Sequence, residues 1–212
     1  MKGFFVTGTD TGVGKTVVSA CLAASLRRSD DVCYWKPVQT GIEEDDDTAM
    51  VAELADCSKD EIYSEGIRLE RPLSPHLSAR LAGVSIDIEG ILVTAANHPR
   101  ERLMIVEGAG GVLVPLNDKE MMIDLIRDLN LPAIVVSRSG LGTINHTLMT
   151  LEVLRRRGIN VAGVVMNGDR NDENRKAVEF YGEIPVIAEI PRFERLAADT
   201  LVPWAQKNIE PI

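Results

Sequence analysis

The sequence predicts an α/β fold with a doubly wound, mainly parallel β-sheet flanked by helices. Short apolar runs alternate along the 212-residue chain with segments whose apolar residues recur at helical spacing. The short runs are apolar throughout, which is typical of strands buried on both faces. The amphipathic segments between them supply the crossover helices that parallel strands need. Since no linker rich in Pro, Gly or Ser divides the chain, we expect a single domain over residues 1–212.

The candidate strands cover residues 4–6, 32–35, 103–106, 133–136, 161–166 and 185–187. Four segments between them show helical periodicity. Their apolar residues are Val17, Val18, Cys21, Leu22 and Leu26, then Ile88, Ile91, Leu92 and Ala95, then Met121, Met122, Leu125, Ile126 and Leu129, and finally Ile144, Leu148, Leu151 and Leu154. Gly158 predicts the end of the last helix. Residues 41–75 are the least regular region, and we expect them to form an insertion over the edge of the sheet.

The composition excludes several classes of partner. Hydrophobic residues make up 45% of the chain, enough for an ordinary core, and the net charge is −9 without any block of Lys or Arg. Nucleic acids and anionic membranes both attract positive surfaces, so we expect neither as a partner. The apolar runs are far shorter than the roughly 20 residues of a membrane span. Cys21, Cys33 and Cys57 form no CxxC pair and predict reduced thiols in a cytoplasmic protein.

The strongest chemical motif is the glycine-rich segment at residues 8–16, which reads GTDTGVGKT. It follows the first predicted strand and opens the first predicted helix, as the phosphate-binding loop of a P-loop NTPase does. We expect Lys15 to reach the β- and γ-phosphates of ATP and the Thr16 hydroxyl to hold Mg²⁺. The motif departs from strict spacing, because Thr9 stands where the first glycine belongs and Gly8 lies one residue earlier. The candidate ATP-binding residues here are Gly12, Val13, Gly14, Lys15, Thr16 and Val17.

Charged residues follow two other predicted strands. Glu107 comes directly after the strand at 103–106, and Lys36 comes directly after the strand at 32–35. Ligands of parallel sheets bind beyond the carboxyl ends of the strands, so both side chains are expected near the P-loop. Glu107 is therefore a candidate Mg²⁺ ligand and Lys36 a candidate second cation over the phosphates. The small residues Gly108, Ala109 and Gly110 would let the backbone approach ATP closely.

An acidic run at residues 43–47 reads EEDDD. Such runs usually form solvated loops, but one member could be a magnesium ligand. Asp47 is the best placed, because we expect it to cap a helix that starts at Thr48. The other four carboxylates are expected to be only solvated. Asn167 and Gly168 follow the strand at 161–166. Two interpretations are equally favoured for them, a simple turn at the strand end and a contact with the base of the nucleotide.

Taken together, the motifs resemble the dethiobiotin synthetase family, the ATP-dependent ring-closing enzymes of biotin synthesis. Four blocks carry the resemblance and lie in the expected order along most of the chain. These blocks are residues 5–16, residues 36–41, residues 106–111 and residues 142–146, and the Ser-Pro-His segment at 74–76 also fits. The first block alone is shared with related ATPases and amidoligases, whereas the combination is far more specific.

The resemblance implies a P-loop α/β homodimer with its active sites at the subunit interface. The substrates would be 7,8-diaminopelargonate, CO₂ and ATP, with Mg²⁺ as cofactor. One amine would take up CO₂ as a carbamate, and the carbamate would attack the γ-phosphate to give a carbamic–phosphoric mixed anhydride. The other amine would then close the ring, giving dethiobiotin, ADP and phosphate.

The resemblance also assigns roles to residues. Lys15 and Lys36 would be catalytic, and Thr16, Asp47 and Glu107 would bind Mg²⁺, although a small shift of alignment would put Asp45 or Asp46 in place of Asp47. The implied adenine contacts are Asn167, Gly168, Pro191, Arg192 and Phe193. The implied substrate contacts are Thr11, Thr40, Thr143, Ile144 and Asn145.

Two alternatives remain open from the sequence. P-loop switch ATPases of the partitioning or cell-division-site type resemble this loop, but they carry a signature lysine where Asp10 stands here. This chain also has no obvious basic amphipathic helix at its C-terminal end for membrane docking. The synthetase domain of a cobyrinate-type amidoligase is the other alternative, and it would be expected to continue into a glutaminase domain beyond Ile212. Activity that depends on the diamine would distinguish all three.

Overall fold

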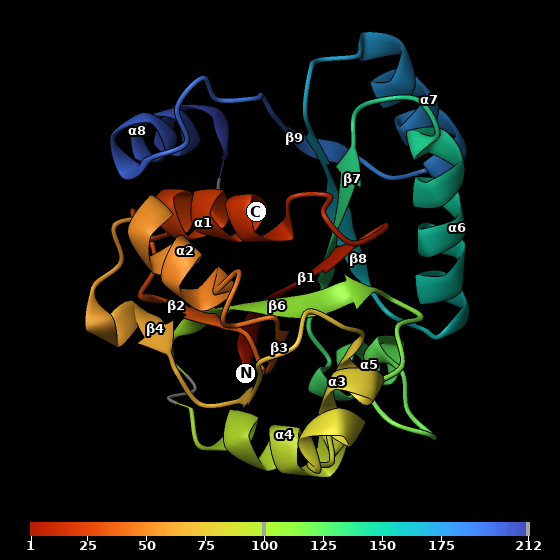
Figure 1. Ribbon diagram of the computed structural model, residues 1–212. Helices are drawn as coiled ribbons and strands as arrows, with labels where there is room; N and C mark the ends of the chain where they lie inside the picture. The colour runs from red at the N-terminus through yellow and green to blue at the C-terminus, as the bar shows by residue number, and fades with distance from the viewer. Residues whose placement is uncertain (99–100, 211–212) are drawn as a thin grey trace.

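The computed structural model describes residues 1–98 and 101–210 and shows a seven-stranded sheet with helices on both faces (Figure 1). The strand order is β4-β2-β6-β1-β7-β8-β9, and every pair of neighbours is parallel. The earlier strands β2, β4 and β6 lie on one side of β1 and the later strands β7, β8 and β9 on the other, so the sheet winds in both directions from its centre. The predicted doubly wound parallel sheet is confirmed.

All six predicted strands are present. The strands of the sheet are β1 (Lys2–Gly8), β2 (Val32–Trp35), β4 (Ile62–Tyr63), β6 (Leu103–Gly111), β7 (Ala133–Arg138), β8 (Val161–Asn167) and β9 (Val186–Ile190). The short strands β3 (Val38–Thr40) and β5 (Ile67–Leu69) pair separately. β6 continues past its predicted end at residue 106 to Gly111, because its last residues still pair with the end of β1.

The four predicted helices are also present, together with others. The helices are α1 (Lys15–Leu26), α2 (Asp47–Leu54), the 3₁₀ turn η1 (Lys59–Glu61), α3 (Pro75–Ala82), α4 (Ile88–Ala96), α5 (Met122–Leu129), α6 (Thr143–Arg156), α7 (Asp172–Gly182) and α8 (Ala198–Asn208). Among the helices of the described residues, none is long and apolar enough to cross a membrane.

Two cores lie on opposite faces of the sheet, which explains why the strands are apolar at every position. In β2, Tyr34 packs in the core beneath α1, α2 and α8, whereas its neighbour Trp35 packs in the core of α4, α5 and α6. In β1, Val6 packs in the same core as Tyr34, and Phe5 packs in the same core as Trp35. Alternate residues of a strand therefore share a face, and this alternation decides which side chains reach the P-loop.

The region at residues 41–75 does more than cover the edge of the sheet. It contributes β4, which pairs with β2 and is itself an edge strand, and it contributes α2, which packs against α1. The three cysteines are free thiols, as the sequence predicts, with Cys21 and Cys33 buried and Cys57 partly buried.

Candidate active site

The glycine-rich loop joins the end of β1 to the start of α1 at the carboxyl edge of the sheet (Figure 1). Gly14 is the N-cap of α1 and has a φ of 95°, a left-handed conformation that favours glycine. A Cβ atom at this residue would lie 1.9 Å from Nδ2 of Asn167, so the site also has no space for a side chain. Since no side chain caps this helix, its first N–H groups can bind an anion.

The loop opens onto a cavity of about 620 Å³. Its walls come from the P-loop, the segment after β2, the start of α2, the loop before α3 and the end of β6. It brings together most of the predicted phosphate, metal and diamine residues. These are Thr11, Gly12, Gly14, Lys15, Thr16, Val17, Lys36, Thr40, Asp47, Glu107, Ala109 and Gly110. Val13 and Gly108 are predicted ATP contacts that do not line it.

Four side chains converge at the floor of this cavity. The Thr16 hydroxyl donates to Oδ1 of Asp47 over 2.6 Å and lies 3.3 Å from Oε1 of Glu107. The Lys36 ammonium lies 2.7 Å from the same Oε1 and 2.5 Å from Oδ2 of Asp47. Trp35, the last residue of β2, is paired in register with Val106 of β6, so the next residues, Lys36 and Glu107, emerge side by side.

Both lysines of the site are buried, and their surroundings shift their pKa values in opposite directions. Burial by itself lowers the pKa of Lys36, but the adjacent Glu107 and Asp47 carboxylates outweigh it and hold this pKa above the usual lysine value. Burial also lowers the pKa of Lys15, and the charge of Glu107 offsets this only in part. The Lys15 ammonium donates to the carbonyl oxygen of Asp10 over 3.3 Å, which holds it against the P-loop.

The oxygen atoms of this cluster fit Mg²⁺. The Thr16 hydroxyl and the Lys36 ammonium each lie within hydrogen-bond distance of both the Asp47 and the Glu107 carboxylates. Hard divalent cations prefer carboxylate and hydroxyl oxygen atoms as ligands. Within the described residues, no group of three or more His, Cys, Asp or Glu side chains is arranged to hold a metal. A magnesium site here would therefore depend on the Thr16 hydroxyl and on oxygen atoms of the bound nucleotide.

The acidic run differs from the prediction in two respects. Asp46, not Asp47, caps α2, because its Oδ1 accepts the backbone N–H groups of Thr48 at 3.0 Å and Ala49 at 3.1 Å. Asp46 is also more than solvated, since its Oδ2 pairs with Arg68 at 2.6 Å. Asp47 is the first helical residue and is thereby turned toward the cavity. The expected cap was wrong by one residue.

No motif or composition signal in the sequence singles out Tyr34. Its hydroxyl donates to Oε2 of Glu107 over 3.1 Å, yet a tyrosine within an apolar strand is typical of a core residue. A usable signal was its spacing, because residues two apart in a strand share a face and Tyr34 lies two before Lys36. Arg138 was also missed. Its guanidinium donates to the carbonyl oxygen of Thr11 over 3.2 Å from the end of β7.

The predicted adenine contacts lie outside the 620 Å³ cavity. Asn167 donates through Nδ2 to the carbonyl oxygen of Val13 over 3.0 Å, so it supports the P-loop. Gly168 and Pro191 line a separate cavity of about 370 Å³. Arg192 forms an exposed ion pair with Asp169 at 3.4 Å. The remaining predicted contact, Phe193, packs edge-to-face against a tryptophan of α8.

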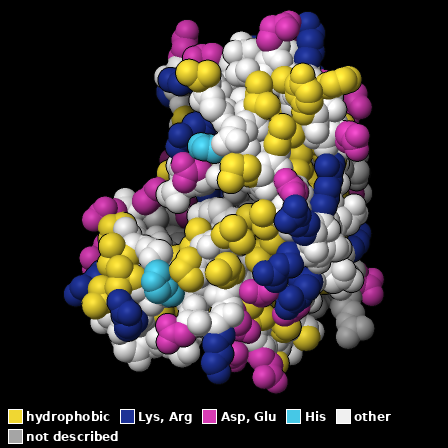
Figure 2. Space-filling model, turned by 90° about the vertical axis from the view of Figure 1, so that its right-hand side faces the viewer, with side chains coloured by type: hydrophobic (Ala, Val, Ile, Leu, Met, Phe, Trp, Pro, Cys, Tyr) yellow, Lys and Arg dark blue, Asp and Glu magenta, His cyan; other side chains and the backbone are white. Residues whose placement is uncertain are grey.

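The predicted substrate contacts at 143–145 begin α6 and also lie outside the main cavity. Gly142 caps this helix without a side-chain hydrogen bond, and the N–H of Thr143 donates to the carbonyl oxygen of Gly140, which leaves the N–H groups of Ile144 and Asn145 available. Thr143 is buried, while Asn145 is exposed. Beside α6 lies an open cavity of about 480 Å³ that is lined by Thr11, Leu113, His146 and Met149 among others. Hydrophobic side chains gather on the face that bears α6 and α7 (Figure 2).

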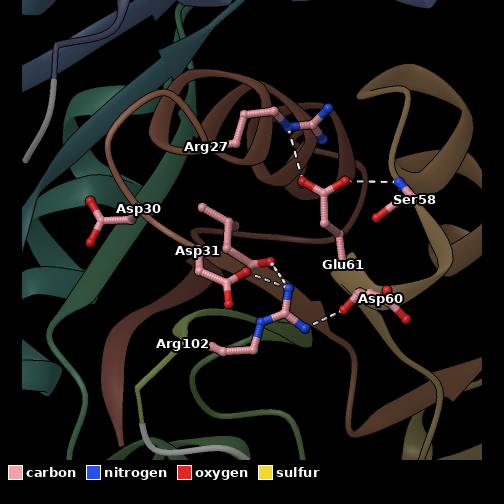
Figure 3. A pocket seen from close by; sticks show the side chains of 8 residues that line it. Arg27, Asp30, Asp31, Ser58, Asp60, Glu61 and Arg102 are labelled. Atoms are coloured by element: carbon pink, nitrogen blue, oxygen red, sulfur yellow. Dashed lines mark hydrogen bonds and ion pairs between the residues drawn. The ribbon is translucent and has the colours of Figure 1, made fainter.

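Another cavity, of about 680 Å³, lies at the amino edge of the sheet, away from the P-loop (Figure 3). Arg27 points to Glu61 in η1, with Nε 3.1 Å from Oε1, and Arg102 lies 2.6 Å from Asp31 at the start of β2. Arg102 also donates to the carbonyl oxygen of Asp60. These contacts tie η1 to the beginnings of β2 and β6, so the polar groups of this cavity stabilise the fold.

Comparisons with known proteins agree with this geometry. A family model described as an AAA domain matches residues 2–200. An ATP-dependent dethiobiotin synthetase of Paramagnetospirillum magneticum is 50% identical over 201 residues, which cover 95% of this chain and 93% of that protein. The corresponding protein of Brucella ovis is 45% identical over 196 residues, which cover 92% and 89%. The chain belongs to the ATP-dependent dethiobiotin synthetase family.

A related sequence also occurs as part of a longer protein. A biotin biosynthesis bifunctional protein of Bordetella avium is 44% identical over 207 residues, which cover 97% of this chain but 43% of that protein. Solved structures show the fold that the family shares with other ATPases. A ParA family ATPase of Chlorobium tepidum aligns with a TM-score of 0.59 at 14% identity, covering 96% of this chain and 97% of that one. The cell division ATPase MinD of Pyrococcus furiosus aligns with a TM-score of 0.56 at 17% identity, covering 98% of each chain.

Proposed function

We propose that the protein catalyses the ATP- and Mg²⁺-dependent carboxylation and ring closure of 7,8-diaminopelargonate with CO₂ to dethiobiotin, in the cytoplasm. The observation that carries the proposal is the convergence of Thr16, Lys36, Asp47 and Glu107 beneath the P-loop. Dethiobiotin synthetases at 45–50% identity over most of the chain support the choice of substrate. The switch-ATPase alternative has support only from structures at 14–17% identity, which share the fold.

The reaction needs three bond-forming steps and no oxidant or reductant. One amine adds to CO₂ and loses a proton, giving a carbamate. A carbamate oxygen then attacks the γ-phosphorus of ATP, and the bond from that phosphorus to the ADP oxygen breaks. The second amine attacks the carbonyl carbon of the resulting mixed anhydride, phosphate leaves, and the amine proton is released. None of these steps requires a protein nucleophile, so positioning and charge stabilisation supply the catalysis.

The protein's contribution follows from its two buried cations. The P-loop backbone and Lys15 hold the β- and γ-phosphates. Lys36, whose neighbours keep it protonated, stabilises the negative charge that develops between carbamate and γ-phosphate. Thr16, Asp47 and Glu107 hold Mg²⁺, which when bound neutralises charge on the phosphates. Thr11 and Thr40, which both line the cavity, present hydroxyl groups to the diamine.

We further propose that the active enzyme is a homodimer with its sites at the subunit interface. The exposed hydrophobic residues Leu113 and Met149 flank the cavity beside α6, and apolar patches of this kind mark interaction surfaces (Figure 2). In the dimer, Thr143, Ile144 and Asn145 of one subunit contact a diamine held by the other. The backbone N–H groups of Ile144 and Asn145 bind its carboxylate, since the N–H of Thr143 donates to the carbonyl oxygen of Gly140. The adenine binds beside Asn167 and Gly168, near the segment from Pro191 through Arg192 to Phe193.

An ATPase assay that depends on the diamine tests the proposal. Purified protein is incubated with ATP, Mg²⁺ and bicarbonate, with and without 7,8-diaminopelargonate, and ADP and the cyclic urea are quantified. We expect equal amounts of ADP and urea, and neither when the diamine or CO₂ is left out. A matched analogue that lacks one of the two amines should give no urea. ATP hydrolysis that is indifferent to the diamine would favour a switch ATPase instead.

A further inference from the structure

Tyr34 makes a buried contact that the proposed function does not use. Its hydroxyl donates to Oε2 of Glu107 over 3.1 Å, and neither residue has any exposed surface. Glu107 is the most deeply buried of the acidic groups at the site, since Asp47 remains partly exposed. A carboxylate in such a place must have its oxygen atoms satisfied by hydrogen bonds.

The sheet register explains how the tyrosine reaches this carboxylate. Tyr34 pairs with Ile105 across β2 and β6, and both side chains pack in the core beneath α1. Two residues further along each strand come Lys36 and Glu107, which share that face of the sheet. The Tyr34 hydroxyl thus approaches Glu107 from the interior of the protein, while the P-loop approaches it from the cavity.

The two oxygen atoms of Glu107 consequently have different partners. Oε2 accepts the hydroxyl of Tyr34, whereas Oε1 is 2.7 Å from the Lys36 ammonium and 3.3 Å from the Thr16 hydroxyl. A phenol is protonated at neutral pH and an ionised carboxylate only accepts hydrogen bonds, so Tyr34 is the donor in this contact. Any orientation of the carboxylate that turns both oxygen atoms away from Tyr34 would lose this hydrogen bond.

We propose that Tyr34 is a positioning residue that fixes the Glu107 carboxylate with Oε1 turned toward the P-loop, ready to bind Mg²⁺. The proposal rests on the proposed function, in which Glu107 is a magnesium ligand. Hydrogen bonds to the far side of metal-binding groups hold those groups in place, and their loss usually weakens metal affinity by about 10–100-fold. A tyrosine that only filled the core would contribute to stability and leave the metal affinity unchanged.

The variant Tyr34→Phe tests this, with Tyr63→Phe as a matched control. Tyr63 donates its hydroxyl to the carbonyl oxygen of Thr94 over 3.1 Å, so each variant loses one hydrogen bond from one tyrosine. Mg²⁺ binding is measured by calorimetry on the full-length protein with a non-hydrolysable ATP analogue, and thermal unfolding is followed without Mg²⁺. We expect Tyr34→Phe to weaken Mg²⁺ binding by about tenfold and Tyr63→Phe to leave it unchanged. In steady-state kinetics, saturating Mg²⁺ should restore most of the kcat of Tyr34→Phe.

Equal Mg²⁺ affinities in Tyr34→Phe and in the wild type would overturn the proposal, provided that Glu107→Gln weakens binding. If Glu107→Gln also leaves the affinity unchanged, Glu107 is not a ligand, and the metal assignment falls together with the role of Tyr34. The two failures are thus distinguishable.

A second measurement does not depend on the folding of a Tyr34 variant. The chain has three tyrosines, so ¹⁹F NMR of protein labelled with fluorotyrosine gives three resonances. The variants Tyr63→Phe and Tyr181→Phe assign the other two. The Tyr34 resonance should move when Mg²⁺ is added to the nucleotide complex, and an unmoved resonance would contradict the proposal.

Discussion

The ammonium of Lys36 lies 2.5 Å from Oδ2 of Asp47, and it holds two acidic side chains that come from different parts of the chain. Asp47 is the first residue of α2. Glu107, the other partner of the ammonium, directly follows the apolar residues 103–106 of β6. This lysine therefore links α2 to β6, and its substitution separates this structural effect from the catalytic role that we propose for it.

Lys36→Ala should lower kcat far more than it lowers ATP affinity. The charge that Lys36 stabilises grows only when carbamate meets the γ-phosphate, so its loss affects the transition state more than the bound substrate. We expect a fall in kcat of about 10²–10³-fold, measured by steady-state kinetics beside titration with ATP analogues. Lys176→Ala, which removes a surface lysine paired with Glu173, is the control. Unchanged turnover in Lys36→Ala would make this lysine structural only.

Lys15→Ala should abolish ATP turnover and leave the protein folded. Burial lowers the pKa of Lys15, so the unfolded chain holds this proton more tightly than the folded one. The protonated side chain therefore costs stability, and the cost disappears as the pH rises from the folded pKa to the unfolded value of 10.5. Chemical unfolding without nucleotide should show Lys15→Ala gaining stability over the wild type at neutral pH and losing that gain toward pH 10.5. A gain that grew with pH would contradict this.

Glu107→Gln and Asp47→Asn should each raise the Mg²⁺ concentration for half-maximal activity by at least about tenfold. Loss of a group that only hydrogen-bonds to a metal ligand already weakens metal affinity by about this factor. The neighbouring variant Asp46→Ala is the control. It removes the cap of α2 and should cost about 0.5–2 kcal/mol of stability with no change in Mg²⁺ dependence. If Asp46→Ala shifts the Mg²⁺ dependence and Asp47→Asn does not, the metal ligand has been misplaced by one residue.

The three thiols should be unreactive in the folded protein. Burial raises the pKa of Cys33 to about 11, and it also raises the pKa values of Cys21 and Cys57. The thiolate is the reactive form, so a raised pKa leaves little of it at pH 8. Titration with a disulfide reagent should show slow reaction in buffer and rapid reaction of all three cysteines in denaturant. One thiol that reacts in buffer as fast as a free cysteine would contradict the buried environment.

Mixed dimers should reveal whether each site is shared. Asn145 is exposed in the first turn of α6, so Asn145→Trp adds bulk there without strain. Leucine at Gly142 would be a poorer choice, because its φ of 89° disfavours a side chain. Neither Asn145→Trp nor Lys15→Ala should be active alone, whereas the mixture should recover up to one working site per heterodimer. Heterodimers that form and remain inactive would show that each subunit binds its substrates alone.

The sequence predicts the sheet well because strands covered on both faces are apolar at every position. It does not predict β4, because a strand of two residues is too short to show a pattern. It also does not predict α7, because Val178 is buried there while the large apolar side chains of Phe180 and Tyr181 are exposed, so the apolar residues do not mark one buried face. Pro203 lies within α8, and a proline at such a position is a sequence signal against a helix, so α8 is not predicted either.

The candidate site likewise contains some residues that the sequence predicts and others that it does not. Lys36 and Glu107 are predictable because each directly follows the apolar run of a strand, and the carboxyl ends of parallel strands lie at one edge of the sheet. The roles of Asp46 and Tyr34 depend on partners far along the chain, namely Arg68 and Glu107. Such contacts arise only from the packing of α2 and the register of β2 with β6. Composition and spacing do not contain this information.

The contact between Asn167 and the P-loop has an evolutionary consequence. With Nδ2 of Asn167 1.9 Å from where a Cβ of residue 14 would stand, any larger residue at 14 requires the side chain at 167 to move aside or to be smaller. The two positions should therefore be inherited as a pair. Chimaeras that take the N-terminal half from this chain and the C-terminal half from a relative should retain nucleotide binding only when the donor keeps a side chain at 167 that leaves this space to the loop.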